Sequence, residues 1–240
     1  MTQTKDHIVK SYQQDLKRLH DLVTEMGGMV ERQVALACNA ILQRDRADAT
    51  RAMEADAKVD AREHEIEQFV IQLLALRQPV AGDLRHIVAS LKATGDLERI
   101  GDYAANVAKR SLVLEQFNMR YAATGLAHMA GLVQDNLKRI IDAISADDAE
   151  KAMQVWRSDE AIDEIYNALF RELVTYMMED PRNITPCTHL LFIAKNLERI
   201  GDHATNIAET VYYAVTGIPL TEARPKGDLS AFAVIKPQGN

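Results

Sequence analysis

The residues best suited to chemistry in this chain are eight carboxylates in four pairs, with the two members of each pair four residues apart. The pairs are Asp56 and Asp60, Glu98 and Asp102, Asp159 and Asp163, and Glu198 and Asp202. On a helix this spacing places both side chains on one face, where like charges repel each other mildly. Hard divalent and trivalent cations take oxygen ligands, so a shared cation would remove the repulsion. The pattern predicts that facing helices hold metal ions between these carboxylates, and leaves Mg, Mn, Zn and Fe open as the metal.

The alternative is an ordinary solvated acidic face, in which Arg99 and Arg199 neutralise their neighbours through surface ion pairs. Repetition of the pairs favours the metal, because one matching arrangement recurs in two parts of the chain. His203, which follows Asp202, is a candidate additional ligand. The matching position of the first part is Tyr103, which favours a structural or solvent-facing role for the histidine.

Internal repetition shows that the chain is a duplication. The six residues Leu-Glu-Arg-Ile-Gly-Asp at 97–102 recur unchanged at 197–202, an offset of 100 residues. The aspartate segment at 56–60 matches 159–163, an offset of 103 residues. The second copy is therefore three residues shorter between these segments, and we expect the difference in a connection, because loops absorb length changes at low cost.

Each copy is expected to form three helices. They span about residues 9–44, 47–77 and 82–116, and then 122–145, 147–179 and 185–216. Pro79 and Pro181 disfavour helix just before them, and Ser145 and Asp147 are suitable N-caps for the fifth helix. Helices this long must bury their apolar stripes against one another. The fold class is therefore all-α, a tandem repeat of two three-helix bundles with six long helices and approximate two-fold internal symmetry.

This organisation divides the chain into three parts. Residues 1–118 form the first repeat, 119–217 the second, and 218–240 a flexible C-terminal tail that is rich in proline and glycine.

The third helix carries an apolar stripe that turns acidic halfway along. At about 100° per residue, one face carries Leu84, Ile87, Val88, Leu91, Glu98, Asp102 and Asn106. The sixth helix repeats the acidic end of this face with Glu198, Asp202 and Asn206. Gly101 and Gly201 each cost about 1 kcal/mol against alanine inside a helix. We therefore expect a neighbouring helix or a ligand to approach closely at both glycines.

Composition narrows the function classes. The chain has 240 residues, 47% of them hydrophobic, and a net charge of −7, which disfavours nucleic-acid binding through the whole surface. Its apolar runs fall short of the roughly 20 residues that cross a bilayer, so we expect contact with a membrane to be peripheral at most. Residues 1–10 are polar where a signal peptide is apolar. Cys38 and Cys187 are expected to be buried thiols in a reducing cytoplasm.

Catalytic signatures are missing from the sequence. It has neither a phosphate-binding GxxxxGK[ST] loop nor a GxSxG nucleophile elbow. Ferritin-like di-iron bundles carry Glu-x-x-His on two helices, but none of the seven histidines here has a glutamate three residues before it. We expect a protein that is not an enzyme and has no catalytic residues. A metal-dependent carboxylate-bundle oxidase or phosphoesterase remains the alternative.

Several segments resemble the PhoU family, the accessory and regulatory proteins of bacterial phosphate transport. The resemblance covers about residues 12–216 and includes the two Leu-Glu-Arg-Ile-Gly-Asp segments. Its other segments are Met26 to Glu31, Arg77 to Pro79 followed by Asp83 to Arg85, and Thr175 to Asp180.

The resemblance implies properties that spacing alone does not show. It implies a cytoplasmic negative regulator of the phosphate-starvation response that restrains uptake. The implied partners are the ATPase of the phosphate ABC transporter, the phosphate-sensing histidine kinase and a second copy of the chain as a homodimer. Some members of the family bind metal at the same carboxylates, which match all eight positions named above. Asn196 replaces Asp96 of the first copy, so the two sites need not be equal in charge.

Overall fold

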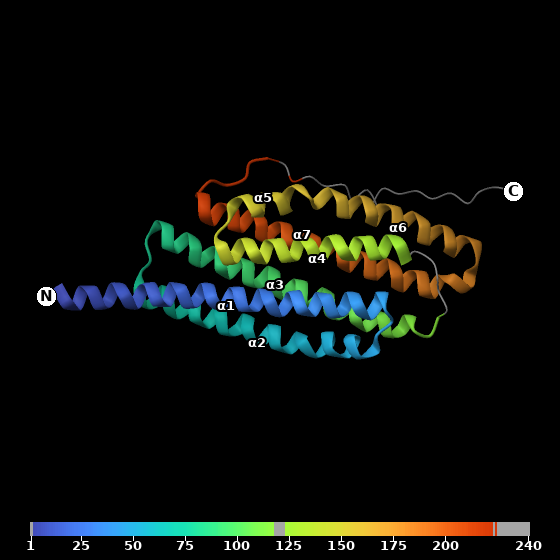
Figure 1. Cartoon of the computed structure of the whole chain (residues 1–240), viewed down its shortest axis with the longest axis horizontal. Coiled ribbons are helices and arrows are strands. Elements are labelled where there is room, and N and C mark those ends of the chain that lie inside the picture. The colour runs from blue at the N-terminus through green and yellow to red at the C-terminus, as the bar shows by residue number, and fades with distance from the viewer. Residues whose placement is uncertain (1, 118–122, 223, 225–240) are drawn as a thin grey trace.

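The computed structural model describes residues 2–117, 123–222 and 224, and throughout these residues the regular elements are helices (Figure 1). The first repeat contains α1 (Thr2–Leu42), α2 (Arg46–Arg77) and α3 (Ala81–Leu114). The second contains α4 (Ala123–Ala146), α5 (Ala149–Arg157), α6 (Asp159–Glu179), the 3₁₀ turn η1 (Pro181–Asn183) and α7 (Ile184–Thr216). The predicted all-α class and the six long helices are confirmed, with one interruption.

The interruption divides the fifth predicted helix at Ser158, where the sequence analysis expected one continuous helix. The Ser158 hydroxyl donates to the Val155 carbonyl at 2.8 Å and to Asn136 Oδ1 at 3.0 Å. A short hydroxyl side chain that bonds to nearby backbone competes with helical hydrogen bonding. The interruption makes Asp159 the first residue of α6.

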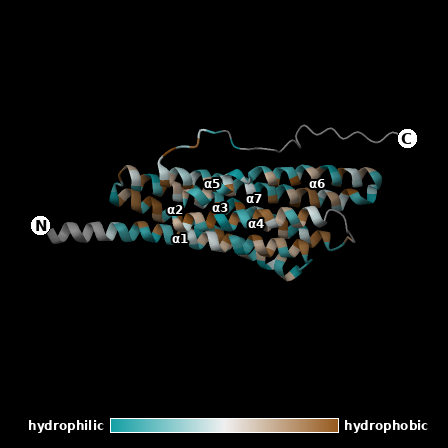
Figure 2. Ribbon diagram, turned by 45° about the horizontal axis from the view of Figure 1, so that its top comes forward, coloured by the Kyte–Doolittle hydropathy of each residue, from teal (hydrophilic) through white to brown (hydrophobic). Residues whose placement is uncertain are grey.

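The two repeats lie side by side along their length. Helix α1 packs on α2 and α3, while α4 packs on α5, α6 and α7. Contacts between α3 and α7 and between α1 and α4 join the repeats (Figure 1). Hydrophilic and hydrophobic residues are interspersed along the helices, as expected when each helix buries one face (Figure 2).

Matching helix starts support the duplication. Asp45 caps α2 and Asp148 caps α5, each accepting from the backbone N–H groups two and three residues later. The residues just before them, Arg44 and Asp147, both adopt positive φ, at 56° and 48°. The cap is therefore Asp148, and the expectation of Ser145 or Asp147 is wrong, because Asp147 adopts the left-handed conformation that turns the chain into α5.

The three-residue difference lies in the connection that the sequence indicated. At the 103-residue offset, the end of α2 at Arg77 corresponds to Asp180. At the 100-residue offset, the start of α3 at Ala81 corresponds to Pro181. Residues 78–80 therefore have no counterpart in the second repeat.

The core follows the repeat. Fully buried side chains occur at matching positions: Met26 and Met129, Val30 and Val133, Leu97 and Leu197, and Ile100 and Ile200. A Cβ on Gly101 would lie 3.0 Å from Gln33 Oε1, and one on Gly201 would lie 2.9 Å from Ile162 Cδ1. The predicted close approach of a neighbouring helix at both glycines is confirmed, as is the burial of both cysteines, whose thiols are free.

The apolar stripe of α3 differs from the expectation. Ile87 is buried, but Leu84, Val88 and Leu91 are 41%, 40% and 37% exposed. Leu84 and Val88 border a groove of about 690 Å³ together with Tyr213. The residues that fill the core of α3 are those of the opposite stripe, such as Leu97. The carboxylates of α3 therefore continue a partly exposed face rather than a core face.

Helix α7 ends at Thr216 and is capped by Gly217, which adopts a left-handed φ of 72°. A Cβ there would lie 2.9 Å from Arg85 Nη1, so both space and backbone conformation favour glycine. The chain then turns back across α5 (Figure 1). Of the predicted tail 218–240, residues 223 and 225–240 lie outside the described residues, as does the predicted boundary between repeats at 118 and 119. Among the helices that the structure describes, none is long and apolar enough to span a bilayer.

Candidate functional site

The first carboxylate site consists of Asp56 and Asp60 on α2 and Glu98 and Asp102 on α3. Burial, followed by the charge of Asp102, raises the pKa of Glu98 from 4.5 to about 7. Burial also raises the pKa of Asp56, with the charges of Asp102 and Asp60 adding to the effect. The two pairs thus act on each other across the helix interface, as the sequence analysis expected.

Positive charge near this site is loosely placed. Arg99 lies 3.6 Å from Glu98 and 3.8 Å from Asp102, and its side chain is 60% exposed. Exposed ion pairs at such distances are worth little. Arg199, the matching residue, lies over the ring of Tyr103 rather than on a carboxylate of its own repeat. Arginine neutralisation is therefore weak in the first repeat.

Gln33 on α1 is the main polar support of the first site. Its side chain is fully buried, and Nε2 lies 3.1 Å from each of three acceptors: Asp56 Oδ1 and the carbonyls of Ala52 and Gly101. Its Oε1 is buried without a hydrogen-bond partner. The bond to Asp56 favours the ionised carboxylate, opposing the effect of burial on its pKa. Gln33 thus ties α1, α2 and α3 together at the carboxylates.

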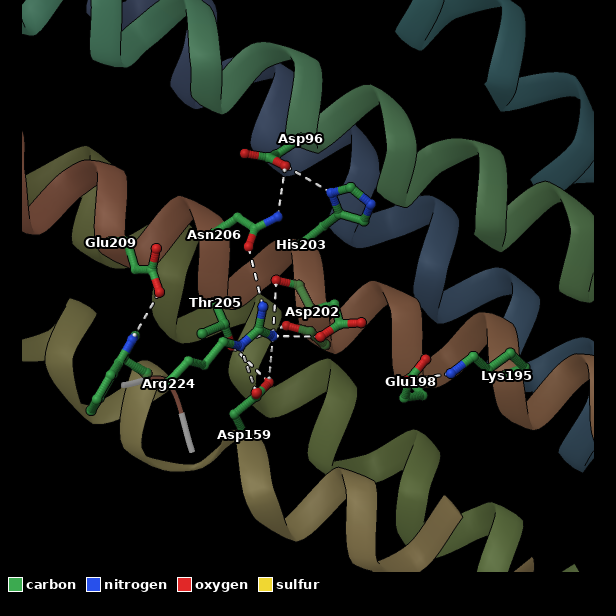
Figure 3. A network of polar contacts seen from close by, with 12 residues as sticks. Asp96, Asp159, Lys195, Glu198, Asp202, His203, Thr205, Asn206, Glu209 and Arg224 are labelled. Carbon is green, nitrogen blue, oxygen red and sulfur yellow. Dashed lines mark hydrogen bonds and ion pairs between the residues drawn. The ribbon is translucent and has the colours of Figure 1, made fainter. Parts of the chain in front are cut away.

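The second carboxylate site consists of Asp159 and Asp163 on α6 and Glu198 and Asp202 on α7. Here the Arg224 guanidinium lies between two of the carboxylates (Figure 3). It donates to Asp159 Oδ2 at 2.8 Å, Asp159 Oδ1 at 2.9 Å and Asp202 Oδ1 at 2.6 Å. Thr205 Oγ1 also donates to Asp159, at 2.9 Å.

The other half of the second site is also buried. Asp163 is 4% and Glu198 5% exposed. Lys195 donates to Glu198 Oε1 at 2.8 Å, while Glu198 Oε2 is buried without a hydrogen-bond partner. Burial raises the pKa of Glu198 to about 7, although the bond from Lys195 opposes this effect. The negative charges of Asp202 and Asp163 raise the pKa of Glu198 further.

A polar link joins the second site to the first repeat. Asp96 Oδ1, on α3, accepts from Asn206 Nδ2 at 3.4 Å and lies 2.7 Å from His203 Nδ1 (Figure 3). His203 also lies against the ring of Tyr103. His203 therefore has a structural role at the junction between the repeats, the role that the sequence analysis favoured over metal ligation.

The donor chemistry of both sites suits a cation. In the second site two carboxylates already converge on one positive charge, and Glu198 offers an unpartnered buried oxygen. In the first site burial raises the pKa values of Asp56 and Glu98, and repulsion from neighbouring carboxylates adds to the effect. Across the described residues, however, no group of three or more His, Cys, Asp or Glu side chains is arranged to hold a metal ion. Cation binding at the eight carboxylates therefore stays a prediction.

Sequence reasoning missed several functional side chains. Gln33 lies in a core stripe of α1, and only its match to Asn136 at the 103-residue offset could have drawn notice. Arg224 lies in a segment predicted to be flexible, and nothing in its local sequence indicates a partner. Thr205 replaces Ala105 at the 100-residue offset, which is a visible departure from the repeat beside Asp202.

Comparison with known proteins decides the family. The PhoU domain model matches twice, at residues 23–111 and 126–211. The chain belongs to the PhoU family. A relative from Caulobacter vibrioides, named phosphate-specific transport system accessory protein PhoU homolog, is 51% identical over 93% of this chain and 98% of its own length. A relative from Rhizobium meliloti with the same name is 47% identical over 94% of this chain and 95% of its own length.

Solved PhoU structures share the fold. The crystal structure of PhoU from Pseudomonas aeruginosa superposes with a TM-score of 0.84 at 39% identity and covers 86% of this chain and 100% of its own. The crystal structure of PhoU from Streptococcus pneumoniae superposes with a TM-score of 0.81 at 30% identity, and it covers 88% of this chain and 100% of its own. The two PhoU domain matches contain all eight carboxylates and Gln33, whereas Arg224 lies beyond the second match.

Replacing Gln33 with leucine tests its supporting role. Leucine fills similar space but removes the donor to Asp56 and to two buried carbonyls, so we expect the free energy of unfolding to fall by about 1–3 kcal/mol. Urea denaturation measures it. Gln68→Leu, on the exposed face of α2, is the matched control and should change stability by less than about 0.5 kcal/mol. Equal effects of the two substitutions would contradict the role of Gln33.

Proposed function

We propose that this chain is a cytoplasmic accessory protein of phosphate transport, which restrains uptake through the phosphate ABC transporter and represses the phosphate-starvation response. The observation that carries the proposal is the 51% identity to an accessory-protein relative along nearly the full length of both chains. Relatives at 47% and 40% identity carry the same name. None of these names describes an enzyme, so they do not favour the carboxylate-bundle oxidase or phosphoesterase.

The proposed mode of action is that of an adaptor. The chain would contact the transporter ATPase and the sensor histidine kinase, and would act as a homodimer. A long helical surface with two similar repeats suits simultaneous contact with two proteins. The partly exposed apolar side chains of α3, Leu84, Val88 and Leu91, are available for such contact.

We also propose that the carboxylate sites bind a divalent or trivalent cation. Burial raises the pKa values of Glu98 and Glu198 to about 7, and the charges of neighbouring carboxylates add to the effect. A bound cation would return these carboxylates to the ionised state and link α2 to α3, and α6 to α7. It would thereby stiffen each bundle and make its surface depend on the metal.

Deletion of the gene tests the regulatory proposal. We expect phosphate-starvation genes to be expressed in phosphate-rich medium, and cellular phosphate to rise, because the restraint on signalling and uptake is lost. Reporter expression and total phosphate are the measurements, with the wild-type gene restored as the control. Normal repression and normal phosphate content in the deletion strain would refute the proposal.

Affinity capture from membranes tests the partners. Tagged full-length protein should retain the transporter ATPase and the sensor kinase, in amounts that change between phosphate-rich and phosphate-starved cells. Sizing by light scattering checks the homodimer. Capture of neither protein under either condition would contradict the adaptor.

A further inference from the structure

We propose that Arg224 is the resident cation of the second carboxylate site, so that its guanidinium competes there with a free metal ion. The inference rests on the cation binding proposed above and goes beyond it, because it makes the two repeats unequal. The first repeat would take a cation directly. The second would take one only when the Arg224 guanidinium leaves the carboxylates.

The contacts of Arg224 are those of a built site. Both oxygens of Asp159 accept from the guanidinium, and Asp202 contributes its carboxylate at 2.6 Å and its backbone carbonyl at 3.3 Å. Asn206 Oδ1 accepts at 3.2 Å. Bidentate carboxylate pairing is the strongest form of arginine ion pair. Carboxylate, carbonyl and amide oxygens are also the ligands that a hard cation prefers, so the guanidinium and a metal ion would need the same atoms.

Burial distinguishes this ion pair from a surface contact. The side chain of Arg224 is 15% exposed and that of Asp159 is 4% exposed. Asp159 would be a buried unpaired charge without Arg224, since its other partner, Thr205, is neutral. In the first repeat the equivalent Asp56 is partnered by the neutral Gln33 and is only partly buried. In the second site a buried arginine therefore pairs with two of the carboxylates, whereas the arginine of the first site, Arg99, is exposed and loosely placed.

The position of Arg224 also connects the second carboxylate site to the junction between the repeats. Arg224 Nη1 donates to Asn206 Oδ1, and Asn206 Nδ2 donates to Asp96 on α3 (Figure 3). Loss of the Arg224 guanidinium from this position would leave the Asn206 amide free to turn and weaken its contact with Asp96. Binding of a cation in the second site would thus change the contacts at the face where α7 meets α3.

The sole tryptophan offers a native probe of this site. Trp156, on α5, donates through its indole N–H to Glu209 Oε1 at 3.0 Å, and Glu209 is one of the acidic groups that act on Arg224. Terbium(III) is a hard, oxygen-seeking ion that emits when a nearby indole is excited. Selective excitation of tryptophan therefore reports Tb³⁺ in the second repeat, while titration calorimetry reports binding in the whole chain.

The experiment compares Tb³⁺ titrations of the full-length wild type and Arg224→Gln. We expect the substitution to strengthen the binding seen through Trp156 by about tenfold or more, because the wild-type site is available only in the fraction of molecules whose arginine has withdrawn. Arg224→Lys keeps the charge without the bidentate geometry and should lie between the two. Arg182→Gln removes an exposed arginine of the same repeat and should match the wild type. Circular dichroism melting confirms that each variant is folded.

Each outcome bears on the inference. Identical indole-sensitised titrations of wild type and Arg224→Gln would overturn it, and Arg224 would then be a fixed structural ion pair. The double variant Glu98→Gln, Asp102→Asn separates the two proposals, because it should remove calorimetric binding in the first repeat and leave the Trp156 signal unchanged. If Tb³⁺ binds the first repeat but Arg224→Gln shows no stronger binding through Trp156, the competition by Arg224 is refuted and the cation binding of the first repeat is not. No Tb³⁺ binding in any protein would refute both.

Discussion

Replacing Glu98 and Asp102 with glutamine and asparagine is expected to abolish cation-dependent stabilisation of the first repeat. A ligand that binds only the folded state stabilises it by about 2.7 kcal/mol at a hundredfold excess over the dissociation constant. The double variant lacks two of the four carboxylates of the first site, so this gain should disappear. Without metal the variant should remain folded and be slightly more stable, because burial and the charge of Asp102 both disfavour the ionised Glu98 that the substitutions remove. Thermal melting with and without Mg²⁺, Mn²⁺, Zn²⁺ and iron measures both effects.

The matched control is the double variant Glu54→Gln, Lys58→Gln, which changes exposed residues of α2 outside the carboxylate face. It should keep the full metal-dependent shift of the wild type. If no metal shifts the wild-type midpoint, or if the carboxylate variant shifts as much as the wild type, the first site does not bind a cation. The carboxylates would then be an acidic surface with Arg99 as its local counter-charge.

The fold was predictable because its signals are repeated and local. Two copies of one six-residue segment established the duplication, and Pro79 and Pro181 marked the helix ends within a few residues. The break at Ser158 was not predictable in this way. It depends on a hydrogen bond to Asn136, a residue more than 20 positions earlier on another helix. A serine can lie within a helix or at a break in one, and here the hydrogen bond to a residue of another helix favours the break.

The candidate site was predictable in part, for a related reason. Helical spacing brought the four carboxylates of each repeat to facing surfaces, and the structure places them there. The spacing could not show which face of α3 meets the core, because Leu84, Val88 and Leu91 form as regular a stripe as the residues that are buried. Nor could it reveal Arg224, whose partners are 22 and 65 residues away along the chain.

The stability of the wild type should fall as pH rises from about 4.5 to about 7, and Glu198→Gln should remove much of this dependence. Burial raises the pKa of Glu198 from 4.5 to about 7 in the folded state. Between these values the folded chain holds a proton that the unfolded chain has lost. Stability from this group is therefore fully present below pH 4.5 and is lost as pH rises through 7. The size of the loss is about 3 kcal/mol.

Urea denaturation at a series of pH values measures this effect as the difference between wild type and variant. A neutral glutamine resembles the protonated glutamate and can still accept from Lys195, so the two proteins should be about equally stable near pH 4.5. Above pH 7 the variant should be the more stable one, since it does not bury a charge beside Asp163 and Asp202. Glu160→Gln, on the exposed side of α6, is the control and should run parallel to the wild type. Parallel curves for Glu198→Gln and wild type would mean that the buried carboxyl ionises as it does in solvent. The buried, destabilised carboxylate that motivates a cation in the second repeat would then be absent.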